Sequence, residues 1–446
     1  MNHKLFSEFK KSTDQEVWAQ IHKDLNSLSY DSTLTWESLD GIKIQPFYDR
    51  FNANKKKLVN SFPKYWKTSH TIVVKNDLKM ALEACKAAKK QDVEIIMLRL
   101  SNTTLSIKEL VDAFEEIELI FYLIFEIIPP VKFLKELDLK NWIFIFDPIT
   151  QLAQTGNWLI DQEADLKAWS TLVHAKKRTS YIYIDNRIHQ NAGATIPQQL
   201  SFALSQAVDY LSRINSSTES VEVVFHVALG SNYFFEIAKI QALKTVFSAI
   251  LSVYDFKIKY KVIAEPSQRN LTIQDYNVNM LRSTIAMMAG ILGGSDVLNN
   301  LSYDTAFNKP NEFGDRIAQN QLLILKKESF FDQVTNPAEG SYYIEQLTQE
   351  FAEHALNDFK EIEGKNGFMS LLLDEEIQKR ISKSAQREQD LFDRGELVLI
   401  GVNRYQDFDA PKTKSTRIVE KHNDKTLIDP IRVIRLSEKI EQHDGK

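Results

Sequence analysis

The segment YIYIDNRIHQNAGATIPQQLSFALSQAVDYL, residues 181–211, contains one complete strand-loop-helix unit. Residues 181–184 are β-branched or aromatic, which predicts a short strand. Thr195-Ile196-Pro197-Gln198 has the form of a capping box, in which the hydroxyl and the amide each satisfy a free backbone N–H, and it places a proline in the first turn. We therefore expect a helix from about Ile196, with its apolar residues recurring at three- and four-residue spacing on one buried face.

The same alternation continues on both sides of this unit, from about residue 93 to about residue 345. A second helix with helical apolar spacing is expected after Asn232. The other predicted strands are residues 93–100, 119–128, 142–146, 221–227 and 256–262, with two weaker ones near Val297 and Tyr342. About eight such units over roughly 250 residues predict an α/β fold of the (β/α)8 TIM-barrel type, and an open doubly wound sheet is the alternative.

The segments outside the barrel differ from it in composition, and three parts are predicted: an N-terminal arm at 1–60, the barrel at 61–405 and a polar tail or linker at 406–446. The arm contains an extended segment, 35–48, that has no neighbouring strand to pair with. It is expected to lie on another surface, either its own barrel or a partner. The candidate interface residues are Trp36, Ile42, Ile44, Phe47 and Tyr48.

Composition excludes several classes of protein. The 446 residues are 43% hydrophobic with a net charge of -5 spread along the chain, which does not suit a nucleic-acid binder. A lone cysteine, Cys85, excludes an intramolecular disulfide. The start of the chain lacks the apolar core of a signal peptide, and the most apolar run, 117–131, contains Glu118 and Glu126, so no membrane span is expected. These features predict a cytoplasmic protein.

The polar loop after the strand at 181–184 is the strongest candidate site. Loops in this position carry catalysis in TIM barrels, so Asn186, His189 and Asn191 could form a substrate site. A capped turn with a surface or interface histidine explains them equally well. His226, inside a predicted strand, is expected to be an interior or barrel-mouth histidine. The two glycine-rich segments, 290–294 and 339–341, lack phosphate-loop spacing. No metal-ligand spacing is present, so no metal is predicted.

This loop also begins a resemblance to a known family. His189-Gln190-Asn191-Ala192-Gly193-Ala194-Thr195 is similar to the His-Met-Gln-Glu-Ala-Gly-Ala-Thr motif of methylmalonyl-CoA mutases. Six more segments resemble motifs of that family in the same order, and together they span about residues 30–405: 36–48, 232–239, 282–294, 316–321, 336–345 and 395–405.

The departures from the family pattern carry the functional expectation. Aligned through Ala192-Gly193-Ala194, the family's catalytic histidine falls on Ile188, which cannot hydrogen-bond a thioester carbonyl, and His189 takes the next position. The Thr-Arg-Gly-Pro-Tyr run expected after Tyr48 is missing, and Met287 or Met288 stands where a substrate-contacting glutamine is expected. The cobalamin domain, with its Asp-x-His-x-x-Gly ligand motif, is expected to be absent. No catalytic residue is therefore predicted, and His189, Gln190 and Asn191 are candidates for a vestigial site.

The resemblance thus implies the small, non-catalytic subunit of a heterodimeric isomerase that interconverts methylmalonyl-CoA and succinyl-CoA in propanoate metabolism. Adenosylcobalamin is expected on the large subunit, the partner, and none on this chain. Two alternatives stay open. One is an active mutase barrel that uses a separately encoded cobalamin domain. The other is a stand-alone barrel that acts on another acyl-CoA through His189, Asn191 and Asn186.

Overall fold

The computed structural model divides the chain into two compact units, Met1–Ala53 and Asn54–Lys446, which are described separately. The residues that it describes are 7–10, 12–49, 62–101, 106–114, 116–130, 141–175, 180–214, 220–254, 257–407 and 425–443.

The first unit contains two helices and a short hairpin. Helix α1 (Asp14–Asp24) begins at a capping box formed by Thr13 and Glu16, and α2 is Tyr30–Leu34. The prediction that 35–48 has no strand to pair with was wrong, because β1 (Trp36–Glu37) and β2 (Lys43–Ile44) form an antiparallel hairpin with each other. The turn at Gly41, with φ at +75°, makes this reversal possible.

The predicted interface residues of this unit differ in exposure. Trp36 is 54% exposed and Phe47 is 37% exposed, whereas Ile42 is buried at 1%. The Phe47 ring lies 6.3 Å from the ring of Trp18. The Tyr48 hydroxyl accepts the backbone N–H of Gln45. Ile42 is therefore not available as a contact for a partner, in contrast to the prediction.

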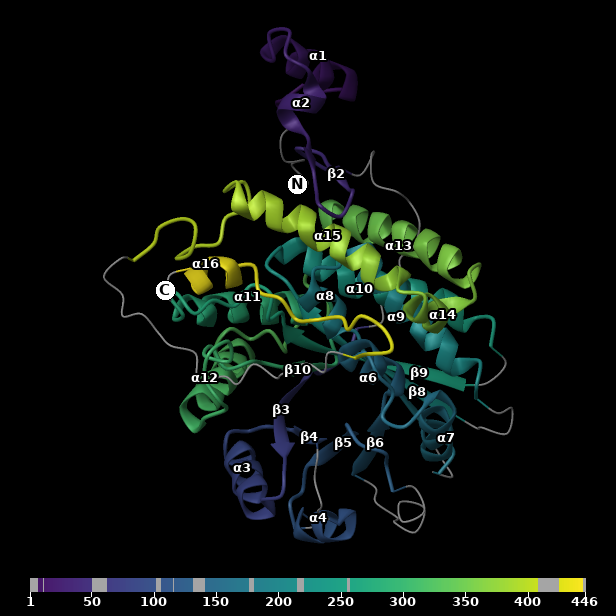
Figure 1. Ribbon diagram of the computed structural model, residues 1–446. Helices are drawn as coiled ribbons and strands as arrows, with labels where there is room; N and C mark the ends of the chain where they lie inside the picture. The colour runs from purple at the N-terminus through teal and green to yellow at the C-terminus, as the bar shows by residue number, and fades with distance from the viewer. Residues whose placement is uncertain are drawn as a thin grey trace. The chain divides into compact units, whose positions relative to one another are not determined.

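The second unit is built on eight parallel strands in the order β6-β5-β4-β3-β10-β9-β8-β7 (Figure 1). The strands are β3 (Lys67–Val74), β4 (Ile95–Leu100), β5 (Ile120–Phe125), β6 (Trp142–Phe146), β7 (Ser180–Asp185), β8 (Ser220–Leu229), β9 (Lys257–Pro266) and β10 (Val297–Asn299). The first and last strands of this order, β6 and β7, come into contact, and the Asp185 N–H donates to the Asp147 carboxylate at 3.2 Å. The structure confirms the predicted (β/α)8 barrel.

Helices connect the strands and extend beyond them. Those of the barrel are α3 (Leu78–Lys90), α4 (Ile107–Phe114), α6 (Pro148–Thr155), α7 (Gln162–Val173), α8 (Arg187–Ala192), α9 (Ile196–Leu211), α10 (Tyr233–Leu251), α11 (Val278–Leu292), α12 (Glu312–Leu323) and the π-helix η1 (Ile324–Glu328). They are followed by α13 (Tyr342–Glu363), α14 (Gly367–Leu373), α15 (Glu376–Asp393) and α16 (Glu438–His443). The predicted capping box at Thr195 and the start of α9 at Ile196 are confirmed.

One predicted strand was wrong and one strand was not predicted. Tyr342 begins the 22-residue helix α13 and not a strand, because its apolar residues continue at helical spacing far beyond the first turn. The missing strand is β3, which pairs with β4 and β10. Residue 256, at the start of a predicted strand, lies outside the described residues.

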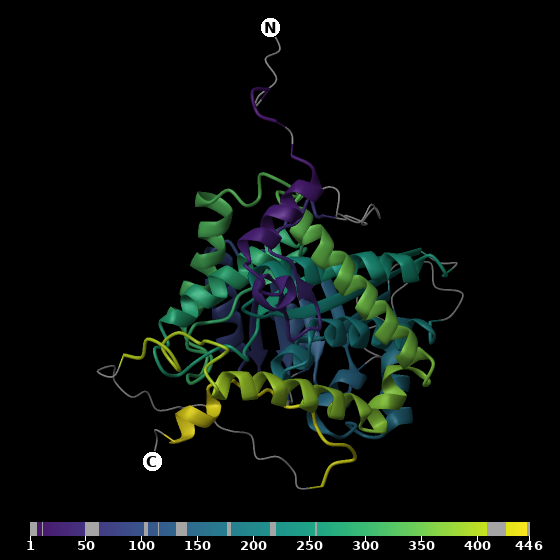
Figure 2. The same ribbon diagram turned by 90° about the horizontal axis from the view of Figure 1, so that it is seen from above.

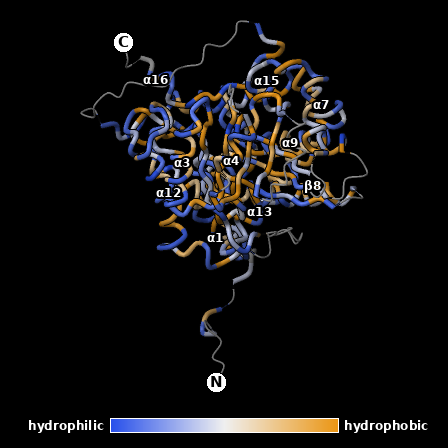
Figure 3. The backbone as a smooth tube through the Cα atoms, turned by 90° about the horizontal axis from the view of Figure 1, so that it is seen from below, coloured by the Kyte–Doolittle hydropathy of each residue, from blue (hydrophilic) through white to orange (hydrophobic). Residues whose placement is uncertain are grey.

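The barrel interior is filled by side chains from seven of the strands. The cluster consists of Ile95, Met97, Tyr122, Ile143, Ile145, Tyr183, Val224, Ile263 and Val297, all buried. Figure 3 shows hydrophobic segments gathered among the central strands of this unit. The barrel is therefore a packed core, and only its two ends can carry a site.

Residues 425–436, here named the C-terminal strap, run across the loops at which strands end (yellow in Figure 1). Backbone N–H groups of the strap donate to carbonyls after three strands: Ile431 to Ala153, Ile434 to Asn191 and Leu436 to Arg269. Ile428, Ile431 and Leu436 are buried. The prediction of a polar tail is thus incomplete for this segment, because these three apolar residues are buried.

Helix α15 covers part of the same end (Figure 2). The Ser384 hydroxyl donates to the Gly193 carbonyl at 2.8 Å. Arg269 is buried; its Nε donates to Glu388 of α15 and its Nη1 donates to the Ile434 carbonyl of the strap. Across the described part of the chain, no helix combines the length and apolarity that crossing a bilayer requires.

Candidate functional site

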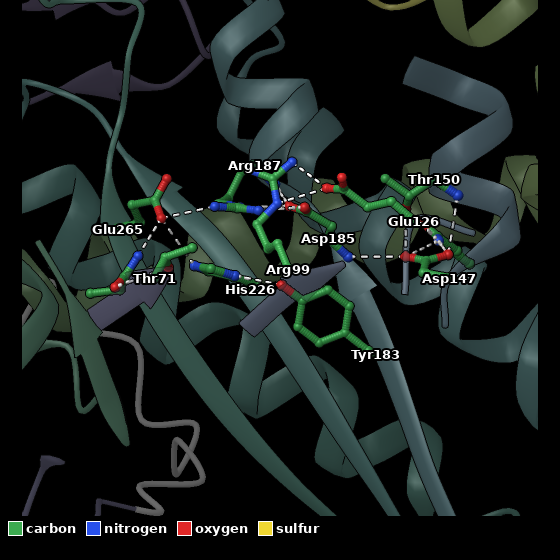
Figure 4. Close-up of polar contacts among 12 residues, drawn as sticks. Thr71, Arg99, Glu126, Asp147, Thr150, Tyr183, Asp185, Arg187, His226 and Glu265 are labelled. Carbon is green, nitrogen blue, oxygen red and sulfur yellow. Dashed lines mark hydrogen bonds and ion pairs between the residues drawn. The ribbon is translucent and has the colours of Figure 1, made fainter. Parts of the chain in front are cut away.

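Charged side chains meet at the end of the barrel where the strands finish (Figure 4). This mouth network is defined by Arg99, Glu126, Asp185, Arg187, His226 and Glu265. Each lies at or near the carboxyl end of a strand, which is the end at which TIM-barrel enzymes place their active sites.

Arg187, the first residue of α8, is the centre of the network. Its Nε and Nη2 donate to the two carboxylate oxygens of Asp185 at 2.7 and 2.6 Å, and its Nη1 donates to Glu265 at 2.8 Å. Burial raises the pKa of Asp185, but the Arg187 guanidinium outweighs it and lowers that pKa to about 2. Asp185 is therefore ionised at neutral pH, and the Arg187 guanidinium is shared between the buried side chains of Asp185 and Glu265.

His226 connects the network to the barrel interior. The Tyr183 hydroxyl lies 2.6 Å from Nδ1 of His226, and Nε2 of the same ring lies 3.6 Å from Glu265. Asn299 Nδ2 donates to that Glu265 carboxylate at 2.6 Å. Burial, reinforced by the nearby Arg187 cation, holds the pKa of His226 well below its usual range. His226 is thus a neutral, hydrogen-bonded barrel-mouth histidine, as predicted.

Two further carboxylates complete this end of the barrel. Arg99 Nε donates to Glu126 at 2.7 Å in the more exposed part of the network. Asp147, after β6, accepts hydrogen bonds from the Tyr210 hydroxyl and the Thr150 hydroxyl, both at 2.6 Å. Burial raises the pKa of Asp147 to about 6, although these hydrogen bonds oppose it.

The mouth network satisfies its own charges. Among the described residues, Glu126, Asp185 and Glu265 each accept a hydrogen bond from a guanidinium, and no group of three or more His, Cys, Asp or Glu side chains is arranged to hold a metal ion. Nδ1 of His226 is hydrogen-bonded to Tyr183, whereas its buried Nε2 has no hydrogen-bond partner among the described residues. The arginines and carboxylates of the network are therefore paired with one another.

Among the sequence-predicted site residues, His189 and Asn186 contact each other, whereas Gln190 and Asn191 contact other parts of the scaffold. His189 is fully buried, with Nδ1 2.6 Å from the Asn186 amide oxygen and its ring against Phe202 and Phe368, outside the barrel axis. Gln190 accepts from Gln199. The Asn191 amide oxygen accepts hydrogen bonds from the Ser267 hydroxyl and the Gln268 N–H. His189, Gln190 and Asn191 therefore each contact a different part of the scaffold.

Ile188 is buried at 4% exposure beside these residues. Among the described residues, the side chains of His189, Gln190 and Asn191 make no hydrogen bond to a side chain of the mouth network. Of the three residues in the stand-alone alternative, His189 and Asn186 contact each other, while Asn191 contacts Ser267 and Gln268.

The mouth network itself was missed by reasoning from the sequence. Asp185, Arg187, Arg99 and Glu265 are not among the predicted site residues, and Glu126 is named only as a charge within an apolar run. The available signal was a charged residue within or directly after an apolar strand. Such a residue can be buried only with a partner, so several of them at strand ends predict that they pair with one another.

Acidification is expected to destabilise the fold through His189 and His226. Burial lowers the pKa of His189 to about 3 and that of His226 well below 6.5. Each therefore contributes stability above pH 6.5 that is lost as the pH falls, with a slope of up to about 1.4 kcal/mol per pH unit per histidine. Denaturant unfolding at pH 7.5, 6.5 and 5.5 measures this loss.

His189→Gln isolates one of the two contributions. Asp147 acts in the opposite direction, because its folded-state pKa of about 6 lies above its unfolded value of 3.8, so its contribution grows as the pH falls between those values. The comparison of variant and wild type cancels this term. The variant should show the shallower pH dependence, and identical slopes would show that His189 is not a source of the acid sensitivity.

The fold and the site together define a (β/α)8-barrel protein whose strand ends are closed by internal ion pairs. Residues 143–444 match the family model described as methylmalonyl-CoA mutase, and the chain belongs to this family. The resemblance noted in the sequence is thereby confirmed.

Relatives within the family differ in how much of their length this chain covers. It is 27% identical to a methylmalonyl-CoA mutase small subunit of Porphyromonas gingivalis, over 91% of this chain and 71% of that one. It is 33% identical to a methylmalonyl-CoA mutase of Cereibacter sphaeroides, over 49% of this chain and 32% of that one. It is 30% identical to a methylmalonyl-CoA mutase large subunit of Propionibacterium freudenreichii subsp. shermanii, over 61% of this chain and 37% of that one. The chain thus spans about a third of the two longer relatives.

Proposed function

We propose that this chain is the small, non-catalytic subunit of a cytoplasmic, adenosylcobalamin-dependent methylmalonyl-CoA mutase, in which it stabilises the catalytic large subunit. The observation that carries the proposal is the mouth network. Catalytic TIM barrels keep polar groups at this end free for a substrate. Here Arg187 is committed to Asp185 and Glu265 at 2.6–2.8 Å.

The position of Ile188 supports the same proposal. Radical rearrangement of a thioester needs the reactive carbon of the cofactor held against the substrate in a dry site, with polar groups on the migrating carbonyl. A buried isoleucine at the place of the family's histidine supplies no hydrogen bond. The 446-residue sequence also contains no Asp-x-His-x-x-Gly motif to ligate cobalt. In the complex, adenosylcobalamin would therefore be held by the large subunit.

The proposed partner is a large mutase subunit, and the proposed contact is the first unit of this chain. The named relatives include both small and large subunits. Exposed aromatic side chains such as Trp36 are typical anchors of stable interfaces. Trp36 and Phe47, at 54% and 37% exposure, remain the strongest of the predicted interface residues.

The purified chain is expected to bind no adenosylcobalamin and to convert no methylmalonyl-CoA by itself. The sequence contains no Asp-x-His-x-x-Gly motif, and the carboxylates of the mouth network are paired with arginines. Titration with the cofactor, followed by the cobalamin absorption spectrum, measures binding, and the co-expressed complex with a large mutase subunit is the positive control. A stoichiometric spectral change with displacement of the lower base, seen with the chain alone, would refute the non-catalytic assignment.

A further inference from the structure

A pocket of about 650 Å³ lies at the opposite end of the barrel from the mouth network. Its walls come from the residues at which the strands begin: Lys67 starts β3, and Glu94, Glu118 and Asn141 lie just before β4, β5 and β6. The end of α3 and the segment after α12 complete it with three lysines, Lys89, Lys326 and Lys327. The packed core of the barrel separates it from the mouth, so it is a site of its own.

The charges around this pocket are not balanced within the chain. Lys326 is committed, since its Nζ lies 2.7 Å from Glu94 and 3.2 Å from the Trp66 carbonyl, and 4.9 Å from the centre of the Trp66 ring. In the part of the chain that the structure describes, Lys67, Lys89 and Lys327 have no carboxylate within ion-pair distance. Asp92 and Glu118 of the same lining offset two of these three charges, so one positive charge remains in excess and favours a bound anion.

The lysines of η1 are placed by an unusual helix. At the end of α12 the backbone widens into a five-residue π-helix, in which the Ser329 N–H donates to the Ile324 carbonyl at 2.9 Å. Leu325 is buried, while Lys326 and Lys327 both line the pocket. A wider turn changes the direction of consecutive side chains, and π-helical segments are rare and frequently found at functional sites.

The remaining wall residues restrict the class of ligand. Asp92 and Glu118 are carboxylates, so a bare anion would be repelled by them as well as attracted by the lysines. They accept hydrogen bonds from hydroxyl or amino groups, as does the Asn141 amide oxygen. A ligand that carries a phosphate can pair with the lysines, and its hydroxyl or amino groups can donate to Asp92, Glu118 and Asn141. The volume of the pocket is in the range of roughly 300–1,000 Å³ that small-molecule sites have.

We propose that this pocket binds a small organic phosphate, a nucleotide or a sugar phosphate, with Lys67, Lys89 and Lys327 around the phosphate and with Asp92 and Glu118 accepting from hydroxyl or amino groups. TIM barrels carry out catalysis at the other end, so the site binds and does not react. Bound ligand stabilises the barrel by mass action. The proposal is independent of the pairing with a large subunit.

Isothermal titration of the full chain with ATP, ribose 5-phosphate, pyrophosphate and adenosine tests this proposal. ATP or ribose 5-phosphate should bind, more weakly in 200 mM than in 50 mM NaCl because salt screens the lysines. Tighter binding of ATP identifies a nucleotide site, and tighter binding of ribose 5-phosphate identifies a sugar-phosphate site. Adenosine should not bind, since it lacks the phosphate.

The double variant Lys89→Gln/Lys327→Gln is expected to weaken binding at least tenfold. The matched control, Lys365→Gln/Lys379→Gln, removes two lysines from exposed ion pairs, one in the turn after α13 and one on α15, and should change the affinity less than twofold. Circular dichroism verifies folding, and Lys327→Gln alone replaces the double variant if that one unfolds. The proposal is overturned if neither ATP nor ribose 5-phosphate binds, if pyrophosphate binds as tightly as both, or if the lysine variants bind as the wild type does.

Discussion

Deletion of residues 1–48 is expected to leave a folded barrel that no longer co-purifies with a large mutase subunit. Residues 1–53 form a compact unit of their own, so the barrel keeps its core without them. The unit exposes Trp36 and Phe47, and apolar area left in water costs about 25 cal/mol per Å². Stable heterodimers commonly bury more than ~2,000 Å² with aromatic anchors. Size-exclusion chromatography of the co-expressed pair measures association, and circular dichroism of the truncated chain measures folding.

Two sets of substitutions distinguish loss of contact with the large subunit from loss of folded structure in this chain. Trp36→Ala/Phe47→Ala should weaken the complex, whereas Leu28→Ala, which truncates another side chain that is 62% exposed on the same unit, should not. If the truncated chain still forms a tight heterodimer, the first unit is not the contact. If it is unfolded, the first unit belongs to the core of the barrel.

Arg187→Met is expected to destabilise the barrel by about 3–5 kcal/mol, because it leaves two buried carboxylates without their cation. Asp185 and Glu265 have side chains that are 12% and 3% exposed, so water cannot replace the guanidinium. The side chain of methionine keeps most of the apolar volume, so the loss reports charge and not a cavity. Denaturant unfolding of the wild type and the variant at pH 7 gives the difference in free energy.

Two further variants identify the cause of that loss. Glu265→Gln in the Arg187→Met background removes one of the uncompensated charges and should recover part of the stability. Arg394→Met breaks an ion pair whose two side chains are both 58% exposed, and its effect should be too small to resolve. Equal losses for Arg187→Met and Arg394→Met would show that the mouth network is not what holds this end of the barrel together.

Much of the barrel could be predicted from its apolar strands, but β3 could not. Its sequence begins with Lys67, Thr68, Ser69 and His70, which do not form an apolar run. Thr68 and Ser69 are nevertheless buried, and the Ser69 hydroxyl donates to the Leu298 carbonyl at 3.2 Å. Only the neighbouring strand β10 makes this polar segment a strand, and that neighbour is distant in sequence.

The opposite error occurred at Tyr342, where three residues with high strand propensity begin a helix. Ile344, Leu347, Phe351 and Ala355 of α13 are buried at helical spacing. This longer period overrides local propensity, because burial of one whole face contributes more than the preference of a few residues.

The candidate site was predictable only in part. The loop at 185–195 was recognised, and His226 was placed correctly, because a polar residue in an apolar strand must find a partner. The partner of Arg187 could not be found in the same way, since Glu265 lies 78 positions further along the chain. Pairing across a barrel is set by the closure of the sheet, which no local pattern encodes.

The C-terminal strap has a consequence for the synthesis of this protein. Its hydrogen bonds end on Ala153, Asn191 and Arg269, yet the ribosome adds it about 125 residues after β10. At roughly 5–20 residues per second, the strands are complete for about 6–25 s before the strap exists. During that interval Arg269 lacks the Ile434 carbonyl to which it later donates. Any chaperone or subunit that covers these loops on the nascent chain must therefore leave them before the last segment can dock.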